Sequence, residues 1–112
     1  MDTKRQNRIS RLIQKELGEI IRKESKNLFN GALITVTSVR VSPDLSVAKI
    51  YLSSFSINKN ADILELVKQS TKVLRYTLAN KVKNQLRIIP ELVFYNDDSL
   101  DYLENIEKLL KQ

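Results

Sequence analysis

The stretch from Ile34 to Ser53 constrains the fold more than any other part of this sequence. It holds two runs rich in β-branched and aromatic residues on either side of the turn cluster Ser42-Pro43-Asp44-Leu45-Ser46. Proline is preset for the second position of such a turn, and an aspartate beside it can bond its own backbone. The stretch is therefore predicted to form a β-hairpin. Because two strands alone are marginal in water, a third strand and helices must cover one face.

Apolar alternation predicts which hairpin residues face the core. Ile34 and Val36 lie on one phase of the first strand and Val39 and Val41 on the other, so a β-bulge or a change of facing is expected near Thr37-Ser38.

The second strand, Val47 to Ser53, places Ala48, Ile50 and Leu52 on the core face. Lys49 and Tyr51 then lie on the open face. A cation beside an aromatic ring can clamp a nucleotide, although a cross-strand pair on a wet sheet face is the commoner explanation of such a pattern.

An amphipathic helix is predicted from about Thr3 to Lys26. Its apolar residues recur at helical spacing: Ile9, Leu12, Ile13, Leu17, Ile20 and Ile21. Six cations, here called the basic stripe, fall within an arc of roughly 60° on the far side. They are Lys4, Arg8, Arg11, Lys15, Arg22 and Lys26. The stripe is either a solvated face or a surface for a polyanion; only Glu19 and Glu24 lie near it.

This helix should end near Asn30 or Gly31, either of which can take the left-handed conformation. After the hairpin, residues 54–60 form a polar linker, and Asn60 is a plausible cap for a helix that begins at Ala61-Asp62. The acidic side chain of Asp62 would then lie in the first turn of that helix.

Ile63, Val67, Leu74 and Leu78 form the apolar face of this second helix. A straight helix would place Lys81 on the same face, and burying an unpaired ammonium is costly, so a bend between about residues 76 and 80 is predicted. The alternative is a straight helix in which the Lys81 ammonium reaches water beyond its apolar stem.

The third strand is predicted at Glu91–Asn96, entered through Pro90, with Leu92 and Phe94 on one face. Residues 97–99 offer another helix cap before a short, acidic terminal helix. Its apolar residues are Leu100, Leu103, Ile106 and Leu110.

Charge is distributed unevenly over the 112 residues. Segments 1–26, 27–89 and 90–112 carry net charges of +4, +6 and −4, which together make the overall +6. A polyanion is the natural partner of the basic body. The N-terminus lacks the apolar region of a signal peptide and no apolar run approaches a membrane span, so a cytoplasmic location without membrane contact is expected.

The residue types argue against an enzyme. The sequence has no histidine and no cysteine, which excludes histidine acid–base catalysis, catalytic triads and cysteine-histidine zinc sites. Its only glycines, Gly18 and Gly31, cannot make a phosphate-binding glycine loop. Capping and ordinary surface charge account for the acidic residues 97, 98 and 101, so neither metal nor cofactor nor small-molecule substrate is expected.

The predicted order αββα(α)βα is an α+β fold, a three-stranded sheet with helices packed on one face. The chain resembles the ribosome-binding factor A family, whose fold is of the KH type in its second topology. The resemblance is carried by RISRLIQKEL from Arg8, ITVTSVRVSPDLSVA from Ile34, Leu74-Arg75 with Leu78-Ala79, and LRIIPELVF from Leu86 followed by Asp98-Ser99. The family's Ala-x-Gly helix kink corresponds here to Ser70-Thr71-Lys72.

The resemblance implies a ribosome assembly factor that binds the small subunit and its 16S rRNA during late maturation and rRNA processing, and that supports growth at low temperature. Free or immature subunits would be preferred to complete ribosomes, and the factor would act as a monomer. Residues 1–96 would form the KH-like RNA-binding domain and residues 97–112 an acidic helix or tail. A protein-interaction module and a general polyanion-binding protein are the alternatives.

Phosphate contacts and shape recognition of folded rRNA are expected, because aromatic residues make up only 6% of the chain. The candidate RNA-binding residues are Lys4, Arg5, Arg8, Arg11, Lys15, Arg22, Arg40, Lys49, Lys72, Arg75, Lys81, Lys83 and Arg87.

Overall fold

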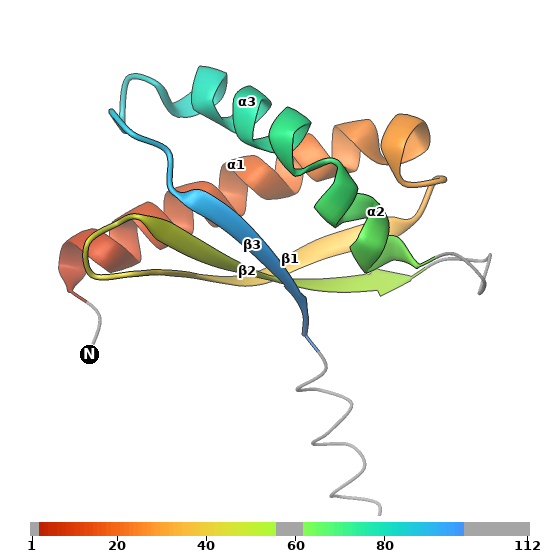
Figure 1. Cartoon of the computed structure of the whole chain (residues 1–112), viewed down its shortest axis with the longest axis horizontal. Helices are drawn as coiled ribbons and strands as arrows, with labels where there is room; N and C mark the ends of the chain where they lie inside the picture. Colours follow the sequence, from red (N-terminus) through yellow and green to blue (C-terminus); the bar gives the residue numbers. More distant parts are fainter. Residues whose placement is uncertain (1–2, 56–61, 98–112) are drawn as a thin grey trace, which may run out of the picture.

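The computed structural model describes residues 3–55 and 62–97. Its elements are α1 (Lys4–Leu28), β1 (Leu33–Val41), β2 (Val47–Phe55), α2 (Ile63–Gln69), α3 (Thr71–Val82) and β3 (Glu91–Asn96). Strand β2 lies at the centre of the sheet, antiparallel to β1 and parallel to β3. Helices α2 and α3 make the crossover that a parallel pair requires. All three helices lie on one side of the sheet (Figure 1), so the predicted layers and the predicted order as far as the third strand, αββα(α)β, are confirmed.

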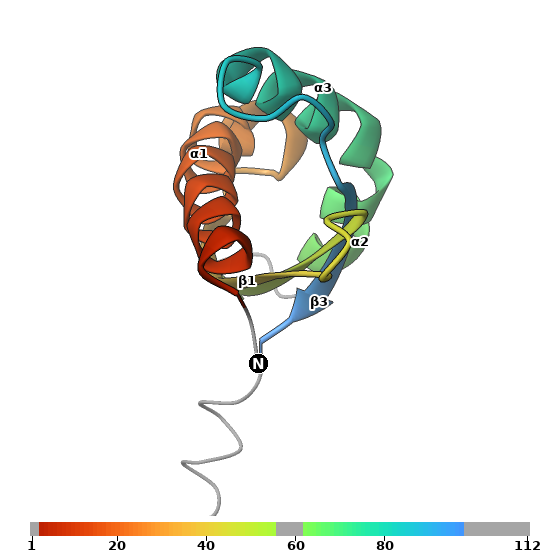
Figure 2. The same ribbon diagram turned by 90° about the vertical axis from the view of Figure 1, so that its left-hand side faces the viewer.

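The core lies between the helices and the inner face of the sheet, two layers that Figure 2 shows from one end. The residues predicted to face inward from β2 and β3 are all buried: Ala48, Ile50, Leu52, Leu92 and Phe94. Helix residues that include Ile13, Leu17, Leu74 and Leu78 are fully buried against them. The opposite face of the sheet is covered by none of the described elements.

The predicted bulge in β1 is present. The register against β2 shifts between Val36 and Ser38, which allows residues on both sides of the shift to point inward. Thr37 is the extra residue, and its hydroxyl oxygen lies 3.1 Å from the carbonyl oxygen of Tyr51.

The predicted hairpin turn closes through hydrogen bonds of its own polar side chains. The Asp44 carboxylate accepts from the Ser42 hydroxyl at 2.7 Å, and from the amide and hydroxyl of Ser46 at 3.1 and 2.8 Å. Leu45 has a φ of 62°, a conformation that this network has to stabilise. At the end of α1 both Asn30 and Gly31 have positive φ, as predicted.

Two boundaries differ from the predictions. Strand β2 continues through Ser54 to Phe55, where a linker was expected. The N-cap of α2 is Asp62, whose carboxylate accepts the Glu65 amide at 3.2 Å, so Asp62 is not a first-turn residue behind an Asn60 cap. Asn60 and the predicted C-terminal helix lie outside the described residues.

The bend predicted at residues 76–80 is wrong, because α3 is uninterrupted from Thr71 to Val82. The break lies at Ser70, whose amide donates to the carbonyls of Leu66 and Val67 and whose carbonyl accepts the Leu74 amide. Its φ of −95° is open to any residue, so the junction needs no glycine. This is the position that the family resemblance indicated.

Candidate nucleic-acid interface

Helix α1 carries the basic stripe, and its N-terminus is fixed to the sheet. A capping box joins Thr3 and Gln6, with their reciprocal amide bonds at 3.1 and 2.8 Å. The Gln6 amide group also donates to the carbonyl of Val41 at 2.9 Å, and only 3% of this residue is exposed. The first turn of α1 is therefore attached to the end of β1, which limits rotation of the helix about its axis.

A second glutamine attaches the middle of α1 to the bulge. Gln14 donates from its amide group to the carbonyls of Val36 and Thr37 at 3.3 and 3.2 Å. The sequence interpretation missed both glutamines. The signal was available, because Gln6, Ser10 and Gln14 recur every four residues beside the apolar face, the spacing of one helix side.

With α1 held in this way, the basic stripe points away from the core. All six of its residues are exposed, whereas Ile9, Ile13, Leu17, Ile20 and Ile21 are buried on the opposite side of the helix. None of the six cations forms an ion pair with a carboxylate of residues 3–55 or 62–97. The stripe is thus a row of positive charges that have no ion-pair partner among the described residues, on a helix that two glutamines fix to the sheet.

Arg40 and Lys49 lie directly opposite one another on β1 and β2. Both are exposed, and both point to the open face of the sheet, since Val39 and Ile50 next to them face the core. They line a pocket of about 310 Å³ together with Tyr51 and the residues around Ser42.

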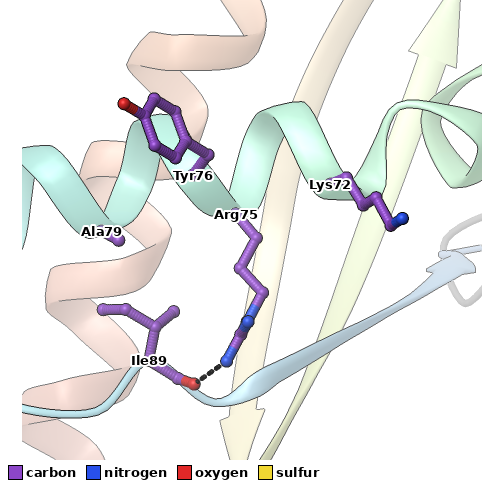
Figure 3. Close-up of a pocket in the computed structure, with 5 residues that line it drawn as sticks. All are labelled: Lys72, Arg75, Tyr76, Ala79 and Ile89. Atoms are coloured by element: carbon purple, nitrogen blue, oxygen red, sulfur yellow. Dashed lines mark hydrogen bonds between the residues drawn. The ribbon is translucent and has the colours of Figure 1, made fainter.

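Lys72 and Arg75 lie on α3 beside a pocket of about 370 Å³ that Tyr76, Ala79 and Ile89 complete (Figure 3). The Arg75 guanidinium donates to the carbonyl oxygens of Ile89 at 2.6 Å and Pro90 at 3.2 Å. Arg75 therefore fixes the segment before β3 to α3, whereas Lys72 is exposed.

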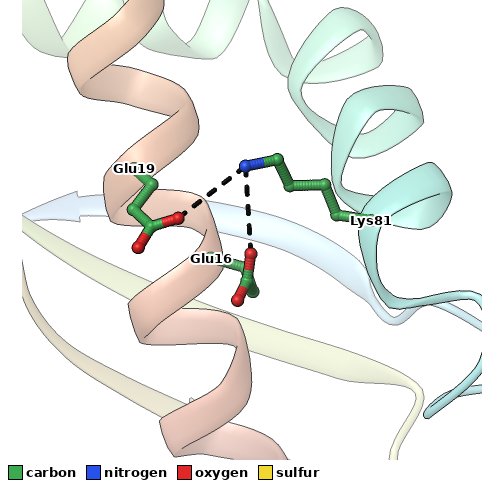
Figure 4. A network of polar contacts seen from close by, with 3 residues as sticks. All are labelled: Glu16, Glu19 and Lys81. Atoms are coloured by element: carbon green, nitrogen blue, oxygen red, sulfur yellow. Dashed lines mark ion pairs between the residues drawn. The ribbon is translucent and has the colours of Figure 1, made fainter.

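Lys81 is close to two carboxylates of α1, with its ammonium 3.9 Å from Glu16 and 3.7 Å from Glu19 (Figure 4). This arrangement explains why α3 stays straight: 31% of the Lys81 side chain is exposed, and its ammonium has partners across the α1–α3 contact. The alternative of a straight helix is correct for residues 71–82, but the helix breaks earlier, at Ser70, and the Lys81 ammonium lies beside carboxylates of α1. Glu16 and Glu19 thus largely compensate the charge of Lys81, whereas the basic stripe has no such partners among the described residues.

Arg5 and Arg87 come together although they are far apart in the sequence. They line a pocket of about 570 Å³ between the first turn of α1, the hairpin turn and the segment before β3. Ile88, in the same lining, is 80% exposed. Lys83 caps the end of α3 and is exposed. The thirteen candidates therefore divide among α1, the sheet face, α3 and this pocket.

Three further observations concern the surface and the helices of the described residues. No group of three or more histidine, cysteine or acidic residues that could hold a metal ion occurs in residues 3–55 and 62–97. The hydrogen bonds from Ser42 and then Ser46 lower the pKa of Asp44 in the turn. None of the described helices has the length and apolarity of a membrane span.

Comparison with known proteins gives consistent matches along the whole chain. The family model described as Ribosome-binding factor A matches residues 5–110. The ribosome-binding factor A of Cytophaga hutchinsonii is 47% identical over 113 residues, which cover 100% of this chain and 84% of that protein.

Two structures of Thermus thermophilus proteins are similar in fold. The crystal structure of ribosome-binding factor A matches with a TM-score of 0.66 and 25% identity, over 81% of this chain and 94% of the other. A homology model of that factor, fitted into a cryo-electron-microscopy map of a 30S–RbfA complex, matches with a TM-score of 0.61 and 31% identity, over 78% and 89% of the two chains. The KH-like α+β fold expected from the sequence is confirmed by such neighbours.

Proposed function

Because the chain belongs to the ribosome-binding factor A family, we propose that it binds the small ribosomal subunit through 16S rRNA and assists late maturation of that subunit. The Thermus thermophilus relative fitted into a map of a 30S–RbfA complex supports this partner. The observation that carries the proposal is the basic stripe, six exposed cations on one side of a helix that two glutamines fix to the sheet.

The stripe suits the backbone of a folded RNA. Lysine and arginine side chains contact phosphates and release counterions, which gives affinity and position more than sequence choice. Double-stranded RNA is recognised mainly by shape and by its backbone. In this proposal residues 1–96 form the RNA-binding domain. Residues 97–112, a segment of net negative charge, are separate from it.

The finer parts of the proposal concern when and where the protein acts. We infer action as a monomer in the cytoplasm, on free or immature subunits rather than complete ribosomes, in support of rRNA processing and of growth at low temperature. No chemical step is assigned to the chain, in keeping with relatives whose name describes a binding factor.

Co-sedimentation tests this function. The purified protein is centrifuged with immature small subunits, mature small subunits and complete ribosomes at low and at moderate salt. Preferential binding to free or immature small subunits is expected, with affinity falling steeply as salt rises.

Equal, salt-sensitive binding to all three particles would indicate a general polyanion-binding protein. Absence of binding would favour a protein-interaction module. Either result would contradict the proposed function.

A further inference from the structure

The open face of the sheet carries two features that the basic stripe does not share. The first is a pair of like charges, Arg40 on β1 directly opposite Lys49 on β2. Side chains at directly opposed positions lie about 5 Å apart at their β-carbons, and like charges there destabilise a sheet. Neither cation forms an ion pair with a carboxylate of the described residues. An anion held between the two would remove the repulsion.

The second feature is an aromatic stack. Tyr51 on β2 and Tyr95 on β3 are register partners, and their rings are stacked with centroids 5.4 Å apart and planes 25° from parallel. Tyr95 is 40% exposed and Tyr51 is half-buried. A flat ring surface of this kind can stack with any of the four nucleobases.

The two features adjoin one another. Lys49 and Tyr51 are two residues apart on one strand and so share a face, and a pocket of about 310 Å³ brings both together with Arg40. Among the described residues, the acidic groups near this pocket form no ion pair with Arg40 or Lys49, so both cations can bind an anion. Asp44 in the turn accepts bonds from Ser42 and Ser46, and Asp97, beyond Tyr95, accepts from the Thr37 hydroxyl at 2.5 Å. Glu91 lies one strand away, opposite Val47.

From this juxtaposition we propose a second RNA site on the open sheet face, where one unpaired nucleotide stacks on Tyr51 and its phosphate binds between Arg40 and Lys49. The inference rests on the proposed function, since it takes RNA as the partner. It differs from the basic stripe in its substrate, because an unpaired base is required and a continuous duplex offers none. The aromatic residues are few, yet two of them meet at this one place.

The test compares two RNA probes and three variants of the full-length chain. The probes are a single-stranded RNA oligonucleotide without internal pairing and an RNA duplex with the same number of phosphates, both measured by fluorescence anisotropy. The variants are Tyr51→Leu, Tyr95→Leu and, as the matched control, Tyr51→Phe, which keeps the ring. Circular dichroism shows that each variant is folded, and Tyr95→Leu replaces Tyr51→Leu if the latter is not.

Loss of a stacked base weakens binding about 5- to 150-fold. We expect that loss of affinity for Tyr51→Leu with the single strand. With the duplex, the affinity of Tyr51→Leu should change by less than about twofold, because the phosphate contacts persist. Tyr51→Phe should bind both RNAs with near-native affinity. Equal affinity of Tyr51→Leu and Tyr51→Phe for the single strand would overturn the inference while leaving the proposed function intact. Higher affinity of Tyr51→Leu for the single strand would also overturn the inference, since the tyrosine ring would then hinder binding. Failure of the native chain to bind the single strand at low salt would overturn the inference, whereas the proposed function is tested separately by co-sedimentation with small subunits.

Discussion

At the scale of single residues, Gln6 fixes the N-terminus of α1 to β1, a role that its place among charged helix residues does not indicate. Its amide group caps α1 and also donates to Val41 of β1, in a buried setting. Gln6→Ala removes the donor and leaves a buried carbonyl unpaired, so we expect the free energy of unfolding to fall by about 1 to 3 kcal/mol. Urea denaturation followed by circular dichroism measures this change.

Gln14→Ala is the matched control for Gln6. Its bonds to Val36 and Thr37 are longer and its side chain is only partly buried, so a smaller loss is expected. An equal or larger loss for Gln14→Ala would contradict the role given to Gln6.

Asp44 provides a pH test of the hairpin turn. Hydrogen bonds from Ser42 and Ser46 lower its pKa below the ordinary 3.8. A carboxyl group whose pKa is lowered by folding stabilises the fold above its unfolded pKa, and that contribution is lost as pH falls through the lowered value. Stability should therefore fall more steeply below about pH 4 in the native chain than in Asp44→Asn.

The Asp44 carboxyl group can be titrated by NMR alongside this comparison. An Asp44 pKa at or above 3.8 would contradict the network described for the turn.

The residue scale also shows what the sequence predicts well. Alternation correctly assigned Ala48, Ile50 and Leu52 to the core, because burial depends on a period that is visible in the chain. The partners of Arg75 and Lys81 were not predictable, because they come from segments brought near only by folding. Both residues had been assigned to RNA binding on charge alone.

At the scale of elements, Arg75 joins α3 to the segment that leads into β3. Its planar guanidinium donates to two successive carbonyls, those of Ile89 and Pro90, which a lysine ammonium cannot reproduce. Because the side chain is largely exposed, Arg75→Lys should lower the free energy of unfolding by only about 1 kcal/mol. Chemical denaturation checks this value.

Lys72→Gln on the same helix is the control for Arg75→Lys, because Lys72 is exposed and makes no hydrogen bond or ion pair with the described residues. Equal stability of the two variants would mean that Arg75 does not fix this segment.

The break between α2 and α3 shows a limit at the same scale. Apolar spacing placed a bend near Tyr76 because Lys81 was treated as an unpaired charge. Glu16 and Glu19 lie far away in the sequence, and only the packing of α3 against α1 brings them to Lys81. The junction at Ser70 has a negative φ and no glycine, so local sequence gave little sign of it.

At the scale of the whole molecule, positive charge lies on several separate surfaces of one small fold. The basic stripe on α1 points away from the core, the Arg40–Lys49 pair is on the open face, and Arg5 and Arg87 line a third surface. The sequence predicted the stripe because helical periodicity defines it. It could not group the remaining cations, since their proximity depends on strand register and on the crossover.

Charge reversal of the basic stripe tests the central claim most directly. Arg8→Glu with Arg11→Glu is compared with Lys23→Glu with Lys68→Glu, exposed cations outside the stripe whose reversal changes the net charge equally. Affinity for small ribosomal subunits is measured by sedimentation over a series of salt concentrations. We predict that the stripe variant binds at least about tenfold more weakly and that its log–log salt slope is smaller by about 2, with little change in the control. Equal losses in the two variants would show that net charge alone drives binding, and would contradict the assignment of the interface to the basic stripe.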